Sequence, residues 1–247
     1  MADAAVKSAA RAIEVLSHFG RVREPQSLKT ICESLGYPQS STTVLLKTLT
    51  SLGYLNYDRL RRVYFPTMKV ASLGEWIPTA LFGRGEALEI MRDVHHSTQE
   101  TVVLATRNDL YIQYIAIRES SHPIRFHVPE GSMRLITSSA VGWLLMSRLK
   151  DREVDNLIRR SNIVAGLGAS ANLKELTEQV RVARIRGYGY AENTPLLGGA
   201  TLSVILPTQI QGQPVVLACG GIIERMRENK SRYLAVLKRS AKAFPEA

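Results

Sequence analysis

Two short amphipathic segments joined by three residues constrain the fold of this chain more than any other feature of its sequence. In "SLKTICESLG", Ser27 suits the start of a helix and Gly36 its end, with Leu28, Ile31, Cys32 and Leu35 spaced at i, i+3, i+4 and i+7. After "GYP", the segment "QSSTTVLLKTL" again shows helical spacing, and we expect Leu45, Leu49 and Leu52 to face a core. Two helices joined by so short a Gly-containing turn predict a helix-turn-helix.

The outer face of the second of these helices is made of short hydroxyl side chains. Ser and Thr form helices less readily than the Glu, Lys, Arg and Gln that usually occupy exposed positions. Short side chains let a helix approach the DNA major groove, donate to phosphate oxygens and press methyl groups against thymine. We therefore predict DNA contacts from Ser40, Ser41, Thr42, Thr43 and Lys47. The alternative is a solvated face of a purely structural helix.

The flanking segments complete a winged helix-turn-helix. Residues 8–19 predict an amphipathic helix whose core-facing stripe is Ala9, Ala12, Ile13, Leu16 and Phe19. Residues 54–57 and 63–65 alternate like two strands around a basic turn. In this motif the third helix enters the major groove and the hairpin, or wing, contacts backbone or minor groove. Further DNA contacts are therefore expected from Arg11, Arg59, Arg61 and Arg62.

The charge balance agrees with an anionic partner. The chain has 247 residues, a formal net charge of +10 and a pI near 9.8, and half of that charge lies in the first 85 residues. Cys32 and Cys219 are its only cysteines, which argues against a disulfide framework and for a reducing cytoplasm. No apolar run approaches a membrane span and the N-terminus lacks a cleavable leader, so we expect a mature, soluble chain.

The remaining pattern predicts a linker and a second domain. Residues 67–85 show loose helical spacing, which indicates a connecting helix, kinked before Pro78, whose Trp76 and Leu81 would suit pairing with a second subunit. Residues 86–247 combine helices with strands, including a hairpin over 100–118 and a third strand over 122–128. We expect two domains: a mainly α winged helix-turn-helix with a β-wing over 1–66, and an α+β sensor-like domain with an antiparallel sheet over 86–247.

The order of these pieces resembles the IclR family of bacterial transcription regulators over nearly the whole chain. The resemblance is carried by "SAARAIEVL", "SLKTICESLGYPQSSTTVLLKTLTSLGYL", "GSMRLITSSAVGWLLMS", "VRVARIRGYGYAEN" and "QPVVLACGG". Each segment is weak alone, but five in family order are specific. The resemblance implies a C-terminal domain that binds a small organic effector, and homodimers or dimer-paired tetramers acting on palindromic double-stranded DNA. The expected function is an effector-responsive transcriptional regulator, with repression of a catabolic operon favoured.

The resemblance also implies an effector cavity between the loop entering the "AVGW" helix and the facing strands. Its lining carries over to Ser139, Ala140, Val141, Gly142, Ala191, Thr201, Ser203, Ala218, Cys219 and Gly220. The sequence departs from the family where Val44 replaces a frequent Arg, so Lys47 or the wing arginines would take over that contact. It also departs at Ala191, Ala218 and Gly220, where members that bind small acids carry acidic or hydroxyl residues. A carboxylate would then depend on backbone N–H groups and on Thr201 or Ser139, which favours an aromatic or otherwise bulky acid.

Other readings of the sequence are less well supported. His95 and His96 are adjacent and cannot share a metal as an i, i+4 pair can, and His122 and His127 have no acidic or cysteine cluster at ligand spacing. We expect neither a metal nor a cofactor, because phosphate-binding glycine motifs are also missing. An enzyme acting on a small carboxylate through residues 86–247 is the main alternative, although no catalytic triad is apparent. Nonspecific architectural DNA binding is the other alternative.

Overall fold

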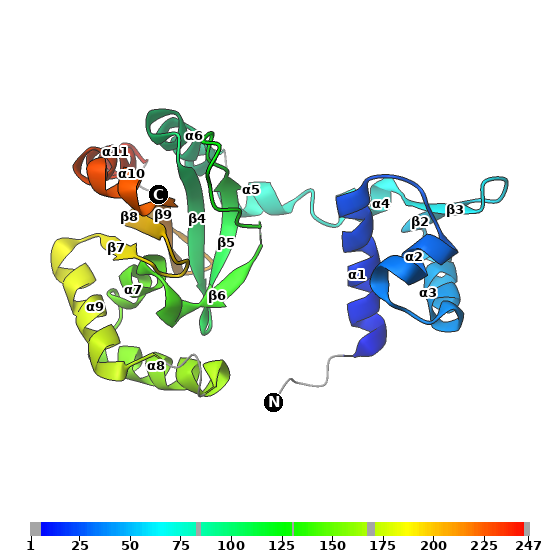
Figure 1. Cartoon of the computed structure of the whole chain (residues 1–247), viewed down its shortest axis with the longest axis horizontal. Coiled ribbons are helices and arrows are strands. Elements are labelled where there is room, and N and C mark those ends of the chain that lie inside the picture. Colours follow the sequence, from blue (N-terminus) through cyan, green and yellow to red (C-terminus); the bar gives the residue numbers. More distant parts are fainter. Residues whose placement is uncertain (1–5, 83–84, 130, 167–170, 245–247) are drawn as a thin grey trace. The chain divides into compact units, whose positions relative to one another are not determined.

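The computed structural model describes residues 6–82, 85–129, 131–166 and 171–244, and the chain divides into two compact units, Met1–Ala80 and Leu81–Ala247. Figure 1 shows both units, helices and a small sheet in the first and a larger sheet covered by helices in the second. The expected two-domain architecture is confirmed.

The first unit is a three-helix winged domain. Its elements are α1 (Lys7–Val22), β1 (Gln26–Ser27), α2 (Leu28–Leu35), α3 (Gln39–Ser51), β2 (Leu55–Asp58), β3 (Val63–Pro66) and α4 (Met68–Ser72). The strands form an antiparallel sheet in the order β1-β3-β2, so β1 adds a strand that the sequence pattern did not reveal. As expected, Ser27 caps α2 by accepting the Thr30 N–H at 3.1 Å, and Gly36 ends it with a left-handed φ of 68°.

The core of this unit meets α3 on a stripe that matches the expected one only in part. The buried side chains of α3 are Thr42, Leu46 and Leu49. Leu49 is buried and the half-buried Leu45 packs against this core, as predicted, whereas Leu52 is exposed and its predicted core position is wrong. The Thr42 hydroxyl donates to the Pro38 carbonyl at 3.0 Å, and that bond lets a polar side chain enter the core.

The predicted core stripe of α1 is also confirmed only in part, because Phe19 is buried and Ala12 and Leu16 pack against the core. Val15, His18 and Phe19 are its buried residues, whereas Ala9 and Ile13 are exposed. Val15 and Phe19 belong to one cluster with Ile31 of α2 and Tyr64 of β3. The helix therefore turns its Val15 side to the core, and the expected positions of Ala9 and Ile13 are corrected.

The second unit is built on a six-stranded antiparallel sheet in the order β6-β5-β4-β9-β8-β7. Its strands are β4 (Thr101–Asn108), β5 (Tyr111–Arg118), β6 (Met133–Leu135), β7 (Gly189–Glu192), β8 (Gly199–Ile210) and β9 (Gln213–Ile222). Its helices are α6 (Glu86–Thr98), η1 (Ile136–Ser138), α7 (Ala140–Met146), α8 (Asp151–Ala165), α9 (Leu173–Arg186), α10 (Ile223–Glu228) and α11 (Lys230–Ala243).

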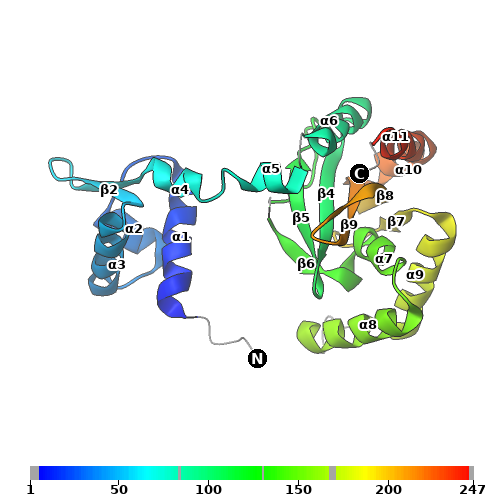
Figure 2. The same ribbon diagram turned by 180° about the vertical axis from the view of Figure 1, so that it is seen from behind.

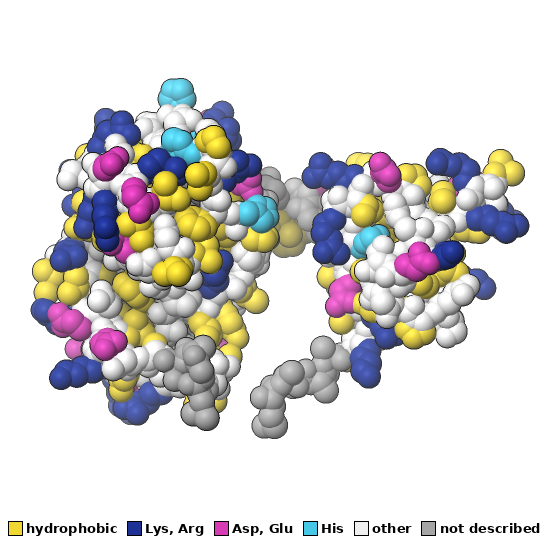
Figure 3. Space-filling model, viewed as in Figure 1, with side chains coloured by type: hydrophobic (Ala, Val, Ile, Leu, Met, Phe, Trp, Pro, Cys, Tyr) yellow, Lys and Arg dark blue, Asp and Glu magenta, His cyan; other side chains and the backbone are white. Residues whose placement is uncertain are grey.

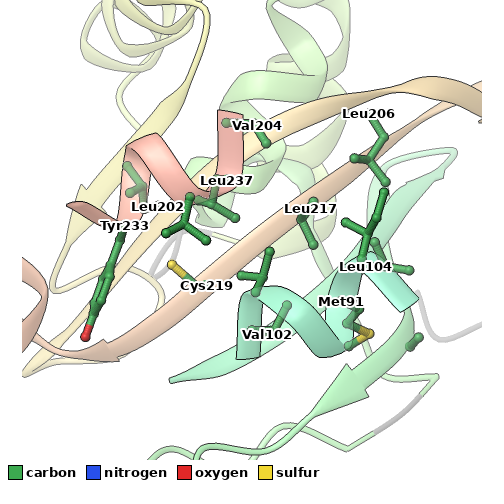
Figure 4. Close-up of a cluster of buried hydrophobic side chains, with 14 of the residues drawn as sticks. Met91, Val102, Leu104, Leu202, Val204, Leu206, Leu217, Cys219, Tyr233 and Leu237 are labelled. Carbon is green, nitrogen blue, oxygen red and sulfur yellow. The ribbon is translucent and has the colours of Figure 1, made fainter. Parts of the chain in front are cut away.

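Two apolar cores lie on the two faces of this sheet. Alternate residues of β4, β8 and β9 pack with α6, α10 and α11 on one face, and with α7, α8 and α9 on the other. Figure 2 shows these two groups of helices on opposite sides of the strands. Figure 4 shows the first core, where Cys219 and Leu217 of β9 lie among side chains that include Tyr233 of α11.

Two expected elements differ from the structure. Residues 122–128 do not form a strand, because Pro123 lacks an N–H and the backbone N–H of His122 bonds to the Ser120 hydroxyl at 3.1 Å. The edge position is taken by β6 instead. The connecting helix is two short helices, α4 and α5 (Ile77–Phe82), and Pro78 lies in the first turn of α5, where a missing N–H is tolerated.

We expect Gly142→Ala to lower the temperature of the thermal transition of the second unit in the full-length protein. The added β-carbon would overlap the carbonyl oxygen of Ile136, a backbone atom that cannot move without displacing η1. Overpacking of this kind costs about 1–3 kcal/mol, which differential scanning calorimetry detects.

Gly20→Ala in α1 is the matched control, because an added β-carbon there has nothing within 4 Å. It should leave stability unchanged or slightly higher, since Ala is the better helix former. An unchanged transition for Gly142→Ala would contradict the close packing of α7 on η1.

Candidate nucleic-acid interface and ligand cavity

The face of α3 opposite the core is a stripe formed by Ser40, Val44, Lys47 and Ser51, here called the outer stripe. These residues follow one another at i, i+4, i+7 and i+11, so they share one side of the helix. All four are exposed, and Val44 keeps 65% of its surface accessible. The outer stripe is therefore the part of α3 that can enter a groove of DNA.

The structure divides the predicted contact residues of α3 into two groups. Ser40, Ser41 and Lys47 are exposed and Thr43 is half-buried, so all four can reach a partner. Thr42 is only 1% exposed and its hydroxyl is bonded to Pro38, so we withdraw it as a DNA contact. The sequence pattern misplaced it because a threonine hydroxyl bonded within its own helix behaves as a core side chain.

Arg11 is held beside the N-terminal end of α3. Its guanidinium carbon lies 4.6 Å from the centre of the Tyr37 ring, and Nη1 donates to the Ser41 hydroxyl at 3.3 Å. Stacking on an aromatic ring restricts a guanidinium without neutralising its charge. Arg11 therefore offers a positioned positive charge next to the outer stripe.

The wing carries three exposed arginines at its tip, Arg59, Arg61 and Arg62. Asp58 shapes the turn by accepting the backbone N–H groups of Leu60 and Arg61 at 2.9 and 3.0 Å. Figure 3 shows Lys and Arg side chains gathered at the end of this hairpin. In the described part of the chain no carboxylate forms an ion pair with these arginines or with Lys47, so their charges stay available.

The second unit contains a cavity of about 60 Å³ on the α7 side of the sheet. Its walls come from β4, β5, β8 and β9, from residues 126–128 and 194–196, and from the start of α7. The lining residues are Thr101, Val103, Tyr114, Phe126, Val128, Arg134, Val141, Thr194, Pro195, Leu196, Gly199, Ala200, Thr201, Cys219, Gly220 and Gly221.

Four of the ten residues that the family resemblance assigned to the effector site line this cavity, namely Val141, Thr201, Cys219 and Gly220. The other six are buried in the surrounding structure and are not part of its lining: Ser139, Ala140, Gly142, Ala191, Ser203 and Ala218.

The side chains of Ser139 and Cys219 both have structural roles. The Ser139 hydroxyl accepts the Gly142 N–H at 3.3 Å as the cap of α7, and Ser139 is not part of the cavity lining. The Cys219 side chain belongs to the core on the other face of the sheet. Burial raises the pKa of its thiol, which stays protonated at neutral pH.

Sequence reasoning missed Arg134 of β6, the one basic side chain that lines the cavity among the described residues. It interacts with the hydroxyl of Tyr114, which is almost fully buried on β5. Burial raises the pKa of Tyr114, and the neighbouring Arg134 charge partly opposes that rise. Phe126 adds a second aromatic wall. The one available signal was that Arg134 lies within the segment "GSMRLITSSAVGWLLMS" that carries the family resemblance.

A buried ion pair holds one wall of the cavity. Glu100 is fully buried and accepts two bonds from Arg225 of α10, at 2.7 and 2.9 Å. Arg225 also donates to the carbonyl of Ile124 at 3.3 Å, and His122 Nε2 lies 3.8 Å from Glu100. Residues 122 and 124 therefore tie the segment that carries Phe126 to the end of the sheet.

Two models of known families match the chain. The IclR helix-turn-helix domain matches residues 8–59, and the bacterial transcriptional regulator IclR C-terminal domain matches residues 84–244. The chain belongs to the IclR family of transcriptional regulators. The expected family is thus confirmed, and DNA binding through a helix-turn-helix is the activity of that family.

Individual relatives match either most of this IclR-family chain or its effector domain. The transcriptional repressor IclR of Escherichia coli K12 is 22% identical over 96% of this chain and 88% of its own length. The effector domain of a regulator IclR from Acinetobacter sp. ADP1 is 42% identical, with a TM-score of 0.62, over 66% of this chain and 96% of that one. An IclR homolog from Microbacterium hydrocarbonoxydans, complexed with 4-hydroxybenzoate, shares the fold at 17% identity and a TM-score of 0.68, over 95% and 96% of the two chains.

Within the described ranges, no helix is both long and apolar enough to cross a membrane. The same residues contain no group of three or more His, Cys, Asp or Glu side chains that could hold a metal ion.

We expect Arg225→Met to lower the free energy of unfolding of the second unit by about 3–5 kcal/mol, because it leaves the Glu100 carboxylate buried without its partner. Urea unfolding followed by tryptophan fluorescence measures this loss. Arg227→Met, two residues away, is the matched control. Its partner Glu192 is about a quarter exposed, so the expected loss is within about 1 kcal/mol. Equal losses for the two variants would contradict the role assigned to the buried pair.

Proposed function

We propose that this IclR-family protein is an effector-responsive repressor that binds a palindromic operator of a catabolic operon as a homodimer or a pair of dimers. The observation that carries the DNA-binding half is a set of exposed cations that form no ion pair among the described residues: Lys47 on the outer stripe and the arginines at the tip of the wing. In a winged helix-turn-helix the recognition helix reads base edges while basic side chains on the wing bind the backbone.

The same geometry assigns different roles to the basic residues. Lys47 lies on the outer stripe and would donate to base edges, whereas Arg11 lies beside the start of α3 and Arg61 on the wing. Arg11 and Arg61 are therefore assigned to phosphates, where each neutralised charge releases counterions.

The effector we propose is an aromatic or otherwise bulky carboxylate. Arg134 supplies the positive charge, the Tyr114 hydroxyl a neutral hydrogen-bonding group, and Phe126 an aromatic wall. Thr201, which the sequence suggested together with Ser139 and backbone N–H groups as a carboxylate partner, also lines this cavity. The complex of the Microbacterium homolog with 4-hydroxybenzoate supports the class of ligand.

Binding of such an acid would couple to a change in the cavity walls. A cavity of about 60 Å³ is smaller than the roughly 150 Å³ cavity that accepts benzene, so the segment carrying Phe126 would move outward. An acid that binds the widened state more tightly shifts the population toward that state. In a dimer this shift would reach the paired DNA-binding units through the linker, residues 67–85, and change operator affinity.

We expect Lys47→Ala and Arg61→Ala to weaken DNA binding in different ways. Lys47→Ala should reduce the ratio of operator to random-duplex affinity, because it removes a base contact. Arg61→Ala should weaken both duplexes alike and reduce the slope of log affinity against log salt by about one. Fluorescence anisotropy at several salt concentrations measures both effects. An unchanged salt slope for Arg61→Ala would contradict the wing assignment.

We expect calorimetry to show that the wild-type protein binds 4-hydroxybenzoate and that Arg134→Met weakens this binding by about tenfold or more, the loss typical of a charged hydrogen bond. Arg148→Met is the matched control, because Arg148 is exposed and does not line this cavity. Binding of only very small oxo-acids such as glyoxylate, or equal binding by the two variants, would contradict the proposed ligand class.

A further inference from the structure

The hydroxyl groups of α3 are bonded to the helix itself. Thr43 donates to the Gln39 carbonyl at 2.7 Å and Thr48 to the Val44 carbonyl at 2.9 Å. Ser41 and Ser51 donate to carbonyls of their own helix in the same way, at 3.1 and 2.9 Å. A hydroxyl has a single hydrogen, so in this state none of these four can donate to a base or a phosphate.

What the helix presents instead is mainly apolar. Val44 lies at the centre of the outer stripe with 65% of its surface exposed. Because the Thr43 and Thr48 hydroxyl oxygens lie against the helix backbone, their methyl groups are the parts left to contact a partner on either side of Val44. On the outer stripe near Val44, the donors that remain are the Lys47 ammonium and the Ser40 hydroxyl, which has no hydrogen-bond partner among the described residues.

A branched apolar side chain in the major groove discriminates between bases. The thymine 5-methyl is the apolar group that base edges display there. Guanine would place its N7 and O6 acceptors opposite Val44, and cytosine or adenine would place an amino donor there. Each of these polar groups would lose its water without gaining a hydrogen-bond partner. Thymine is therefore the base that fits opposite Val44.

We propose that Val44 is a specificity-determining residue of this protein and that it selects a thymine in each half-site by contact with the 5-methyl group. The inference rests on the proposed function, in which α3 enters the major groove of an operator. It goes further in naming the residue, the base and the single chemical group that is recognised.

The test begins with selection of the tightest-binding duplex from a random pool by the full-length protein. Every thymine of that duplex is then replaced in turn by deoxyuridine, which removes the 5-methyl and keeps every hydrogen-bonding group. Anisotropy titrations are made with the wild type, Val44→Ala, Val44→Thr and Ser51→Ala. Ser51→Ala is the matched control, because Ser51 lies on the same stripe at the C-terminal end of α3.

For the wild type, deoxyuridine at one position per half-site should weaken binding by roughly fourfold, the effect of one buried methyl, and by about sixteenfold when both half-sites are changed. Val44→Ala should be insensitive to that replacement. Val44→Thr, which keeps a methyl group, and Ser51→Ala should retain the sensitivity. Circular dichroism and unchanged binding to random duplex would show that Val44→Ala is folded.

Two results would overturn the inference alone: a preferred duplex that tolerates deoxyuridine at every position, or a deoxyuridine penalty that persists undiminished in Val44→Ala. A pool that yields no preferred duplex would contradict the proposed function itself, and the inference with it.

Discussion

The packing of α3 on the small core of the first unit determines which side chains this protein can present to DNA. Burial of Thr42, Leu46 and Leu49 leaves Ser40, Val44, Lys47 and Ser51 as the opposite, solvent-facing side of the helix. The bond from the Thr42 hydroxyl to Pro38 makes this register possible, because an unbonded hydroxyl in that core would be costly. A rotation of α3 by one residue would bring a different set of side chains to the groove, so specificity begins with the packing of an apolar core.

The effector unit depends in a similar way on one buried ion pair, Glu100 with Arg225. Glu100 and Arg225 fix the segment that carries Phe126, while Arg134 and Tyr114 are left facing the cavity. A charge that lines a small cavity is the kind of group that a ligand of opposite charge can satisfy. In the proposed mechanism, residues 122 and 124 stay attached while the part that carries Phe126 moves outward around the acid, and this movement supplies the second arrangement that an allosteric ligand requires.

The sequence predicted features whose causes are local, and missed those whose causes are distant. The cap at Ser27, the stop at Gly36 and the basic hairpin depend on neighbouring residues, and the structure confirms them. The core face of α3 was predicted only in part: Leu45 and Leu49 lie on it, but Thr42 was missed because a pattern of apolar residues counts it as polar, whereas its bond to Pro38 satisfies the hydroxyl. The cavity could not be assembled from the sequence, since Tyr114, Arg134 and Gly220 meet only through strand pairings between distant segments such as that of Thr101 with Gly220. Family resemblance supplied four of its lining residues but not Arg134.

The most direct test of the central claim is fluorescence anisotropy of the full-length protein with labelled duplexes that tile the DNA flanking its own gene, in the absence and presence of 4-hydroxybenzoate. The account predicts that one palindromic tile binds at least about a thousandfold more tightly than random duplex, and that the acid changes the affinity for this tile more than for random DNA. Equal and steeply salt-dependent binding to every tile, unaffected by the acid, would contradict it.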